Sequence, residues 1–194
     1  MAPMQLTRRV LGGLLLAAMS MGVAAAQTVR TEQANDDAYA PAARGATPEW
    51  TAGRVSAGGG VGILGSTPDD AALALTGNAE YFLSPEVSVG PLMQLGLTGD
   101  MTLVGLSGQG KYYILLPDTG DRGRISLQGG LGFVHADYLR DDTSWLVPLG
   151  MGYDYTLDSG AVLSANALVN FTDLHTGFGS GADVMPGFNV GVRF

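Results

Sequence analysis

The chain has 194 residues, of which 14% are charged and 30 are glycine, and its net charge is −8 at pH 7. The absence of cysteine excludes a disulfide framework, a thiolate metal site and a cysteine nucleophile. The acidic balance argues against a nucleic-acid partner. Beyond the N-terminus there is no run of 18 apolar residues, so no transmembrane helix is expected there. This length predicts a single folded domain.

The first 26 residues have the three parts of a secretory signal peptide. Arg8 and Arg9 give a positive start, and residues 10–23 are apolar but too short for a stop-transfer helix. The paired arginines also fit a twin-arginine signal, although a chain exported unfolded would use the ordinary route. We predict a signal peptide over 1–26, with a cleavage site formed by Ala24, Ala26 and Gln27.

Residues 27–48 are polar, rich in alanine and without a period, which predicts a flexible periplasmic lead-in. Residues 49–194 alternate with a period of two, as strands with two different faces do. At the start of this region Val55, Val61 and Ile63 share one face, and glycines fill the other. The alternation predicts eight strands, at 50–63, 73–83, 86–98, 102–115, 124–138, 145–156, 161–172 and 184–194.

Each of these segments reaches the roughly 9–11 residues that a tilted strand needs to cross a bilayer. Since lipid offers no partner for backbone groups, such strands must close into a barrel. We therefore predict an all-β protein, an eight-stranded antiparallel up-and-down transmembrane β-barrel over 49–194. Pro91 and Pro148 fall inside predicted strands, where each removes a ladder donor and leaves the local register open.

Two kinds of connection are predicted between the strands. Short turns are expected at Ser84-Pro85, at 117–123 and at 158–160, where proline, glycine and aspartate gather. Longer loops are expected at 64–72 and 173–183. Short turns at one end and longer loops at the other are typical of outer-membrane barrels, whose short turns face the periplasm.

Alternation alone does not say which face of the barrel is apolar, and a soluble lipocalin-like barrel would turn its apolar face inward. Three features favour lipid on the outside. The non-apolar face is rich in Gly, Ser and Asn, which suits a narrow interior. The chain also ends on an alternating run closed by phenylalanine. Finally, aromatic residues on the apolar face cluster at expected periplasmic strand ends, as in an interfacial girdle: Tyr81, Tyr112, Tyr153, Tyr155 and Phe194.

Two sequence features resemble a known family. The segment Gly187–Phe194 looks like the C-terminal signal that the outer-membrane barrel assembly machinery recognises, carried by Phe188, Val190, Val192 and Phe194. Gly110–Tyr113 and Leu127–Phe133 resemble the fourth and fifth strands of the outer-membrane β-barrel domain family, which is related in plan to OmpA and OmpX. The resemblance spans about 49–194 and implies an eight-stranded barrel in the cell outer membrane, assembled by that machinery.

Charged and amide side chains recur on the face predicted to line the barrel. They could line a water-filled pore or pair with one another in a plugged core. We favour the plug, because eight strands enclose a space that side chains can just fill and buried charges persist when paired. The predicted interior polar network is Arg54, Glu80, Gln94, Lys111, Arg124, Gln128, Asp154 and Arg193.

The two histidines are the natural catalytic candidates. His135 shares a predicted strand face with Asp137, whereas His175 is followed by Thr176 and Gly177. Neither matches the His-x-Ser arrangement of the lipid A-trimming barrel enzymes of the PagL type. A catalytic constellation needs a positioned nucleophile and base. We therefore expect no catalytic residue, no cofactor and no resident metal.

The expected outer loops are acidic. Carboxylates can bind divalent cations, but no spacing here matches a calcium loop. Shared cations could still link these loops to lipopolysaccharide, which we expect, with outer-membrane lipid, as a partner. The carboxylates are Asp69, Asp70, Asp100, Asp137, Asp141, Asp142, Asp173 and Asp183.

The sequence thus favours a non-enzymatic structural or surface-interaction barrel of OmpX-like plan. A narrow channel for small solutes, OmpW-like, is the first alternative, and a lipid-modifying enzyme is the second.

Overall fold

The computed structural model describes residues 51–177 and 179–194. The predicted signal peptide at 1–26 and lead-in at 27–48 lie outside the described residues. In the described ranges, no helix is long and apolar enough to cross a membrane.

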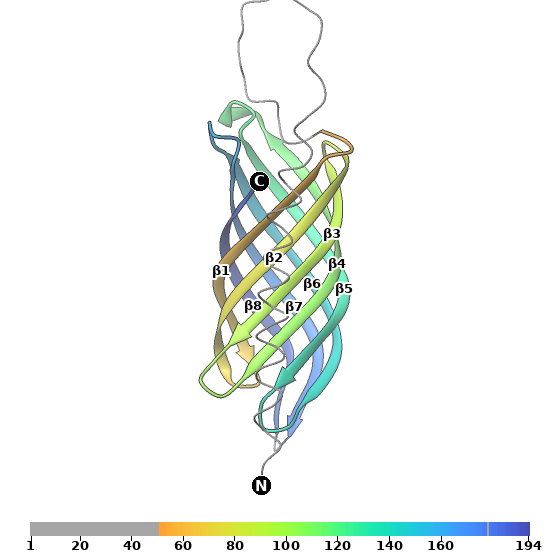
Figure 1. Cartoon of the computed structure of the whole chain (residues 1–194), viewed down its shortest axis with the longest axis vertical. Helices are drawn as coiled ribbons and strands as arrows, with labels where there is room; N and C mark the ends of the chain where they lie inside the picture. The colour runs from red at the N-terminus through yellow and green to blue at the C-terminus, as the bar shows by residue number, and fades with distance from the viewer. Residues whose placement is uncertain (1–50, 178) are drawn as a thin grey trace, which may run out of the picture. The chain divides into compact units, whose positions relative to one another are not determined.

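Eight antiparallel strands close into one barrel, in which each strand pairs with its neighbours in sequence and β1 pairs with β8 (Figure 1). The predicted fold is confirmed, and each predicted segment overlaps one strand. The strands are β1 (Val55–Thr67), β2 (Asp70–Ser84), β3 (Val87–Leu97), β4 (Thr102–Leu116), β5 (Gly123–Asp137), β6 (Asp142–Thr156), β7 (Val162–Gly177) and β8 (Ser180–Arg193).

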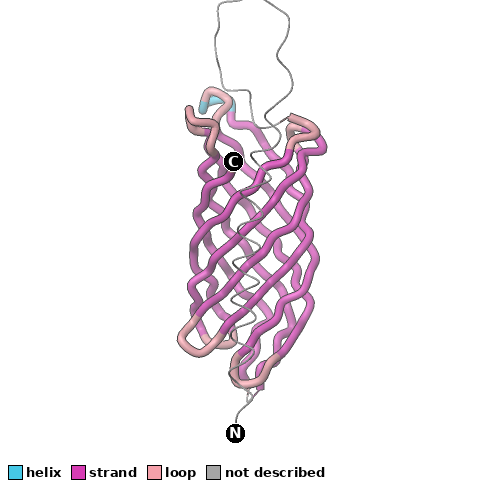
Figure 2. The backbone as a smooth tube through the Cα atoms, in the orientation of Figure 1, coloured by secondary structure: helices cyan, strands magenta, loops and turns pink. Residues whose placement is uncertain are grey.

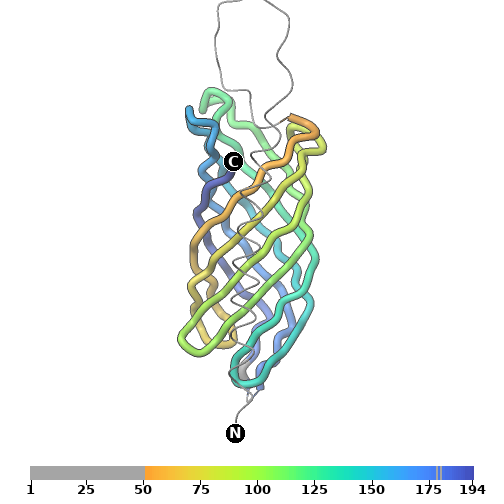
Figure 3. The backbone as a smooth tube through the Cα atoms, in the orientation of Figure 1, coloured from red at the N-terminus to blue at the C-terminus, as the bar shows by residue number. Residues whose placement is uncertain are grey.

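The barrel has two ends with different connections. We call the end with Phe194 the proximal end; it holds the β2–β3, β4–β5 and β6–β7 turns and the short helix η1 (Pro117–Thr119), drawn in cyan in Figure 2. The opposite, distal end holds the β1–β2, β3–β4, β5–β6 and β7–β8 connections. At this end the β5–β6 and β7–β8 hairpins reach further than the other two, as the colours of Figure 3 show.

The prediction of long loops at 64–72 and 173–183 is wrong. β1 continues to Thr67 and β2 begins at Asp70, and β7 and β8 are likewise separated by two residues. The pairing register shifts between Leu64 and Thr67 and again within the distal parts of β7 and β8. These β-bulges insert an extra residue into a strand and break the two-residue period, so the sequence pattern stops where the strands do not.

Both strand prolines are accommodated without a change of register. The β2–β3 ladder passes from Asn78–Leu92 to Tyr81–Val89 and omits Pro91, which pairs instead with β4. Pro148 is omitted in the same way from the β5–β6 ladder but pairs with Asn170 of β7. Since proline lacks a backbone N–H, each interrupts the ladder on one side only.

Several inward glycines are required by the close approach of neighbouring strands. A Cβ atom at Gly62 would clash with the carbonyl oxygen of Phe188, and one at Gly132 would clash with that of Leu106. Neighbouring strand backbones therefore lie closest together at positions where the inward residue is glycine. This leaves the limited interior volume to the polar side chains described below.

Candidate functional site: the barrel lumen and its outer surface

The outer surface of the barrel carries a belt of exposed apolar side chains. Leu131 is 73% exposed, Ile63 64% and Phe188 50%. The belt contains members from every strand, so it surrounds the barrel. An exposed apolar surface of this extent is rare on soluble monomers and indicates a lipid-facing surface. The apolar face therefore points outward, and the soluble alternative with an apolar lumen does not describe this part of the barrel.

The predicted aromatic residues lie at the proximal end of this belt. Tyr81, Tyr112, Tyr153 and Phe194 are exposed on the outer face, and Tyr155 is partly exposed. This is the position of an interfacial girdle, in which amphipathic rings lie at the boundary between hydrocarbon and water.

A network of ion pairs crosses the lumen in the proximal half. The carboxylate Oε1 of Glu80 lies 2.6 Å from Nζ of Lys111 and 2.9 Å from Nη1 of Arg193. The second guanidinium nitrogen of Arg193 donates to Oδ2 of Asp154 at 2.8 Å. All four side chains are buried. Four of the eight predicted interior residues thus form one charge-balanced network that joins β2, β4, β6 and β8.

Three further residues complete the hydrogen bonding of Glu80. The hydroxyl of Tyr113 donates to Oε2 at 2.5 Å, Ser88 donates to the same oxygen at 3.1 Å, and Asn78 donates to Oε1 at 2.7 Å. A buried charge is tolerated when its remaining lone pairs are satisfied in this way. Asn78 lies two residues before Glu80 on the same strand face but was not among the residues predicted for the interior network. Tyr113 was missed because it is an aromatic residue on the inner face, next in the alternation to the polar Ser107, Gln109 and Lys111.

Three other predicted interior residues are also buried inside the barrel. Gln94 makes a reciprocal amide pair with Asn170 across the lumen, at 3.0 and 3.1 Å. Arg124 donates to the carbonyl of Pro85 at 2.8 Å. Gln128 is buried and faces a small cavity.

Arg54 does not belong to the interior network. It precedes β1 and its side chain is exposed at the proximal rim. The alternation assigned it to the inner face, but β1 begins only at Val55, so the barrel wall does not enclose Arg54.

An aromatic layer lies proximal to the ion pairs. Phe82, Tyr113 and Val162 form a buried cluster, and the centroids of the two rings are 5.8 Å apart. The guanidinium carbon of Arg193 lies 5.8 Å from the centroid of the Tyr113 ring, within cation–π range. This layer occupies the lumen on the proximal side of the charged side chains.

The distal lumen is filled by apolar side chains, which the sequence analysis did not predict. Val134 and Met185 have no exposed surface, and Leu103 and Leu174 are 1% exposed. The whole cluster is Leu64, Ala72, Ala74, Met101, Leu103, Val134, Ala136, Leu146, Leu174, Ala182 and Met185, with Tyr138 packed against it. We call this cluster the distal core. The proximal half of the lumen therefore holds the aromatic layer and the ion-pair network, whereas its distal part is apolar.

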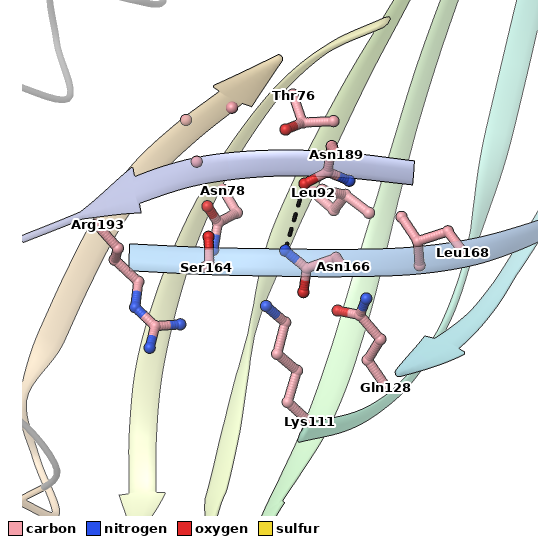
Figure 4. Close-up of a pocket in the computed structure, with 13 residues that line it drawn as sticks. Thr76, Asn78, Leu92, Lys111, Gln128, Ser164, Asn166, Leu168, Asn189 and Arg193 are labelled. Atoms are coloured by element: carbon pink, nitrogen blue, oxygen red, sulfur yellow. Dashed lines mark hydrogen bonds between the residues drawn. The ribbon is translucent and has the colours of Figure 1, made fainter. Parts of the chain in front are cut away.

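Between these two regions lies a cavity of about 30 Å³ (Figure 4). Its lining includes Lys111 and Arg193 of the ion-pair network, together with Gln128, Asn166 and Asn189. Nδ2 of Asn166 donates to Oδ1 of Asn189 at 3.3 Å, the bond drawn in Figure 4.

On β5, β6 and β7 the outward strand residues at the distal end are polar, and Leu139 in the β5–β6 connection is an exposed apolar residue. His135 is partly exposed, and its Nδ1 lies 2.8 Å from the hydroxyl of Thr143 on the neighbouring strand. His175 is 74% exposed and its Nδ1 lies 3.5 Å from a carboxylate oxygen of Asp173. Neither contact brings a serine to an imidazole. In the described part of the chain, no group of three or more His, Asp or Glu side chains is placed to hold a metal ion.

Asp69 links three distal connections. Its carboxylate accepts a hydrogen bond from the hydroxyl of Thr98 at 2.5 Å. A hydrogen bond to the same carboxylate raises the pKa of Tyr138, and the nearby charges of Asp69, Asp100 and Asp70 add to the shift. At least one of the predicted loop carboxylates therefore has a structural role in holding the hairpins together.

The residues of the predicted assembly signal all face outward. Phe188, Val190, Val192 and Phe194 are exposed on β8 and at its end. The backbone of Phe194 exchanges hydrogen bonds with Ala57, and Ser56 donates to its carbonyl at 2.8 Å. These residues form the seam at which β8 closes the barrel against β1.

Solved structures confirm the fold class. No protein-family model matches the sequence, and no curated protein is significantly similar to it. The N-terminal β-barrel domain of Pseudomonas aeruginosa OprF is 17% identical with a TM-score of 0.51, covering 72% of this chain and 97% of that one. Neisserial surface protein A is 15% identical with a TM-score of 0.54, covering 72% and 94%. The chain has the fold of small eight-stranded outer-membrane barrels; identities this low establish the fold alone.

Proposed function

We propose that this protein is an outer-membrane β-barrel with a non-enzymatic structural or surface-interaction role and a plugged lumen. The observation that carries the proposal is the reversal of ordinary protein polarity, with an apolar belt outside and a buried ion-pair network inside. In water the exposed belt would drive aggregation, whereas in lipid it has a suitable solvent.

Export and assembly belong to the same proposal. The signal peptide over 1–26 would direct the chain across the inner membrane. The barrel assembly machinery would then recognise the outward residues of the predicted assembly signal at the end of the chain. The support for the second step is geometric, because the predicted signal residues lie on the strand that closes the barrel. Outer-membrane lipid and lipopolysaccharide are the partners that follow from this location.

A plugged lumen is favoured over a channel because three layers fill it in series. The aromatic layer, the ion-pair network and the distal core each bury their side chains. Eight-stranded barrels have interiors that side chains can fill completely. We expect no single-channel conductance from the folded protein in planar bilayers, and steady ion conductance would support the OmpW-like channel instead.

The lipid-modifying enzyme is the weaker alternative. A hydroxyl–imidazole contact exists between Thr143 and His135, but a nucleophile–base pair is normally oriented by a third group. We expect lipid A from cells expressing the protein to be the same whether position 135 is His or Ala. A lipid A product that disappears in His135→Ala would establish the enzyme.

Cell fractionation and the gel mobility of heated and unheated protein test the proposal directly. We expect the protein in the outer-membrane fraction, with a mobility that changes on heating because detergent does not unfold a closed barrel. A variant lacking 1–26 should remain in the cytoplasm and serves as the export control. Recovery of the full-length product as a soluble periplasmic protein without a heat shift would overturn the proposal.

A further inference from the structure

The cavity between the ion-pair network and the distal core is lined in part by side-chain donors and acceptors that have no hydrogen-bond partner among the described residues. The ammonium group of Lys111 carries three donors, and one of them bonds Glu80. The amide of Gln128 is buried at the cavity wall, and among the described residues no hydrogen bond involves it. Oδ1 of Asn166 is buried without a hydrogen-bond partner in that part of the chain. Figure 4 shows these three side chains converging on one space.

The size of the cavity limits what can bind there. A cavity must offer roughly 10–15 Å³ to hold one water molecule. About 30 Å³ is available here, which is enough for about two water molecules. Sugars, amino acids and lipid headgroups are excluded by volume.

The chemistry of the lining selects among small ligands. Lys111 can only donate, Oδ1 of Asn166 can only accept, and the Gln128 amide does both. A ligand that satisfies all three must donate and accept, which excludes a bare anion and a bare metal cation. The nearby charges also cancel, because Lys111 and Arg193 are balanced by Glu80 and Asp154.

We propose that this cavity is a binding site for internal water, in which about two ordered molecules bridge Lys111, Gln128 and Asn166. The site completes the hydrogen bonding of Lys111, so that a charged lysine is retained in a lumen sealed on its distal side by apolar side chains. It is distinct from the ion-pair network, since it uses donors and acceptors that the network leaves unused.

Oxygen-17 magnetic relaxation dispersion of the folded chain in detergent micelles counts long-lived internal waters directly. We expect about two in the wild type and fewer in Asn166→Leu, which replaces the acceptor with an apolar side chain of similar size. Asn170→Leu is the matched control, because Asn170 lies on the same strand and faces the lumen but does not line the cavity. It should retain the wild-type number.

Folding of each variant is checked by heat-modifiable gel mobility before the count is compared. The proposal is overturned if the folded wild type holds no long-lived water, or if Asn166→Leu keeps the full number. A loss in Asn170→Leu equal to that in Asn166→Leu would also overturn it, because the waters would then not belong to this cavity. Water–amide NOEs at Gly60 and Gly191, which line the cavity, give a second readout that does not depend on any variant.

Discussion

The middle and proximal part of the barrel and its distal end have opposite polarity. In the former, Leu149 and Met151 face outward while Asp154 and Lys111 are buried inside. At the distal end the distal core fills the inside, and Thr143, Asp173 and His175 face outward. One continuous sheet therefore resembles a membrane barrel along most of its length and a soluble barrel at its distal end.

This difference indicates where the hydrocarbon layer ends. On β5, β6 and β7 the outermost apolar residues are Phe133, Trp145 and Phe171, and the outward residues beyond them are polar. Aromatic rings are favoured at such a boundary. Beyond this boundary the outer face of the barrel meets water. There the folded state is stabilised by burial of apolar side chains inside the barrel. The longer β5–β6 and β7–β8 hairpins contribute Val134, Leu146 and Met185 to the distal core, so their inner faces stay packed where their outer faces meet water.

The largest effect is expected from the ion-pair network. Glu80→Gln removes the charge that compensates Lys111 and Arg193 and should lower the free energy of unfolding by about 3–5 kcal/mol, measured by urea titration in lipid vesicles. Glu86→Gln is the control, because Glu86 is exposed and should change stability little. Addition of Lys111→Met to Glu80→Gln should recover part of the loss. Equal stability of the two glutamate variants would show that the lumen is hydrated enough to screen the network.

The distal core should respond as the interior of a soluble protein does. Leu146→Ala removes a side chain that is 2% exposed and should cost about 2–5 kcal/mol of unfolding free energy. Leu149→Ala, three residues along the same strand but facing lipid, should cost much less, since hydrocarbon chains fill the space it leaves. If both substitutions cost the same, the distal lumen is not a packed core.

Introduced charges on the outer face should locate the boundary. Leu149→Arg in the middle of the belt should destabilise the barrel in lipid vesicles by about 2–4 kcal/mol. Thr143→Arg, on the same strand beyond Trp145, should have almost no effect. A large penalty at Thr143 would place this residue inside the hydrocarbon and would remove the proposed boundary.

The smallest expected effect is at the amide pair between the two regions. Gln94→Leu leaves the buried amide of Asn170 unpaired and should cost about 1–3 kcal/mol. The double variant with Asn170→Leu should cost less than the sum of the two single variants, because neither amide is then unsatisfied. A double-mutant cycle of unfolding free energies measures this coupling, and additive losses would show that the pair contributes no coupling.

The sequence predicted the parts of the molecule in which the two faces of a strand meet different solvents. Where one face meets lipid and the other a polar lumen, apolar and polar residues must alternate. The eight strands, their outward face and the proximal aromatic residues could therefore be read from the pattern. Glu80, Lys111, Asp154 and Arg193 were identified as interior for the same reason.

The alternation of apolar and polar residues is lost where both faces of a strand meet apolar surroundings. At Leu103-Val104, Phe133-Val134 and Trp145-Leu146 both faces are apolar, because the boundary of the belt outside overlaps the distal core inside. With no contrast between the faces, the distal core could not be recognised from sequence. The bulges near Thr67 and in the distal part of β8 hid the ends of the strands in the same region.

The sequence by itself determined the number of strands, their alternation and the polarity of the barrel wall, because these follow from a local two-residue period. Only the tertiary structure decided which interior side chains meet. Glu80 and Arg193 are 113 residues apart, and Gln94 and Asn170 are 76 apart. Their contacts depend on strand tilt, bulges and closure of β8 against β1, which set the height of each side chain in the lumen and are not recorded in any local pattern.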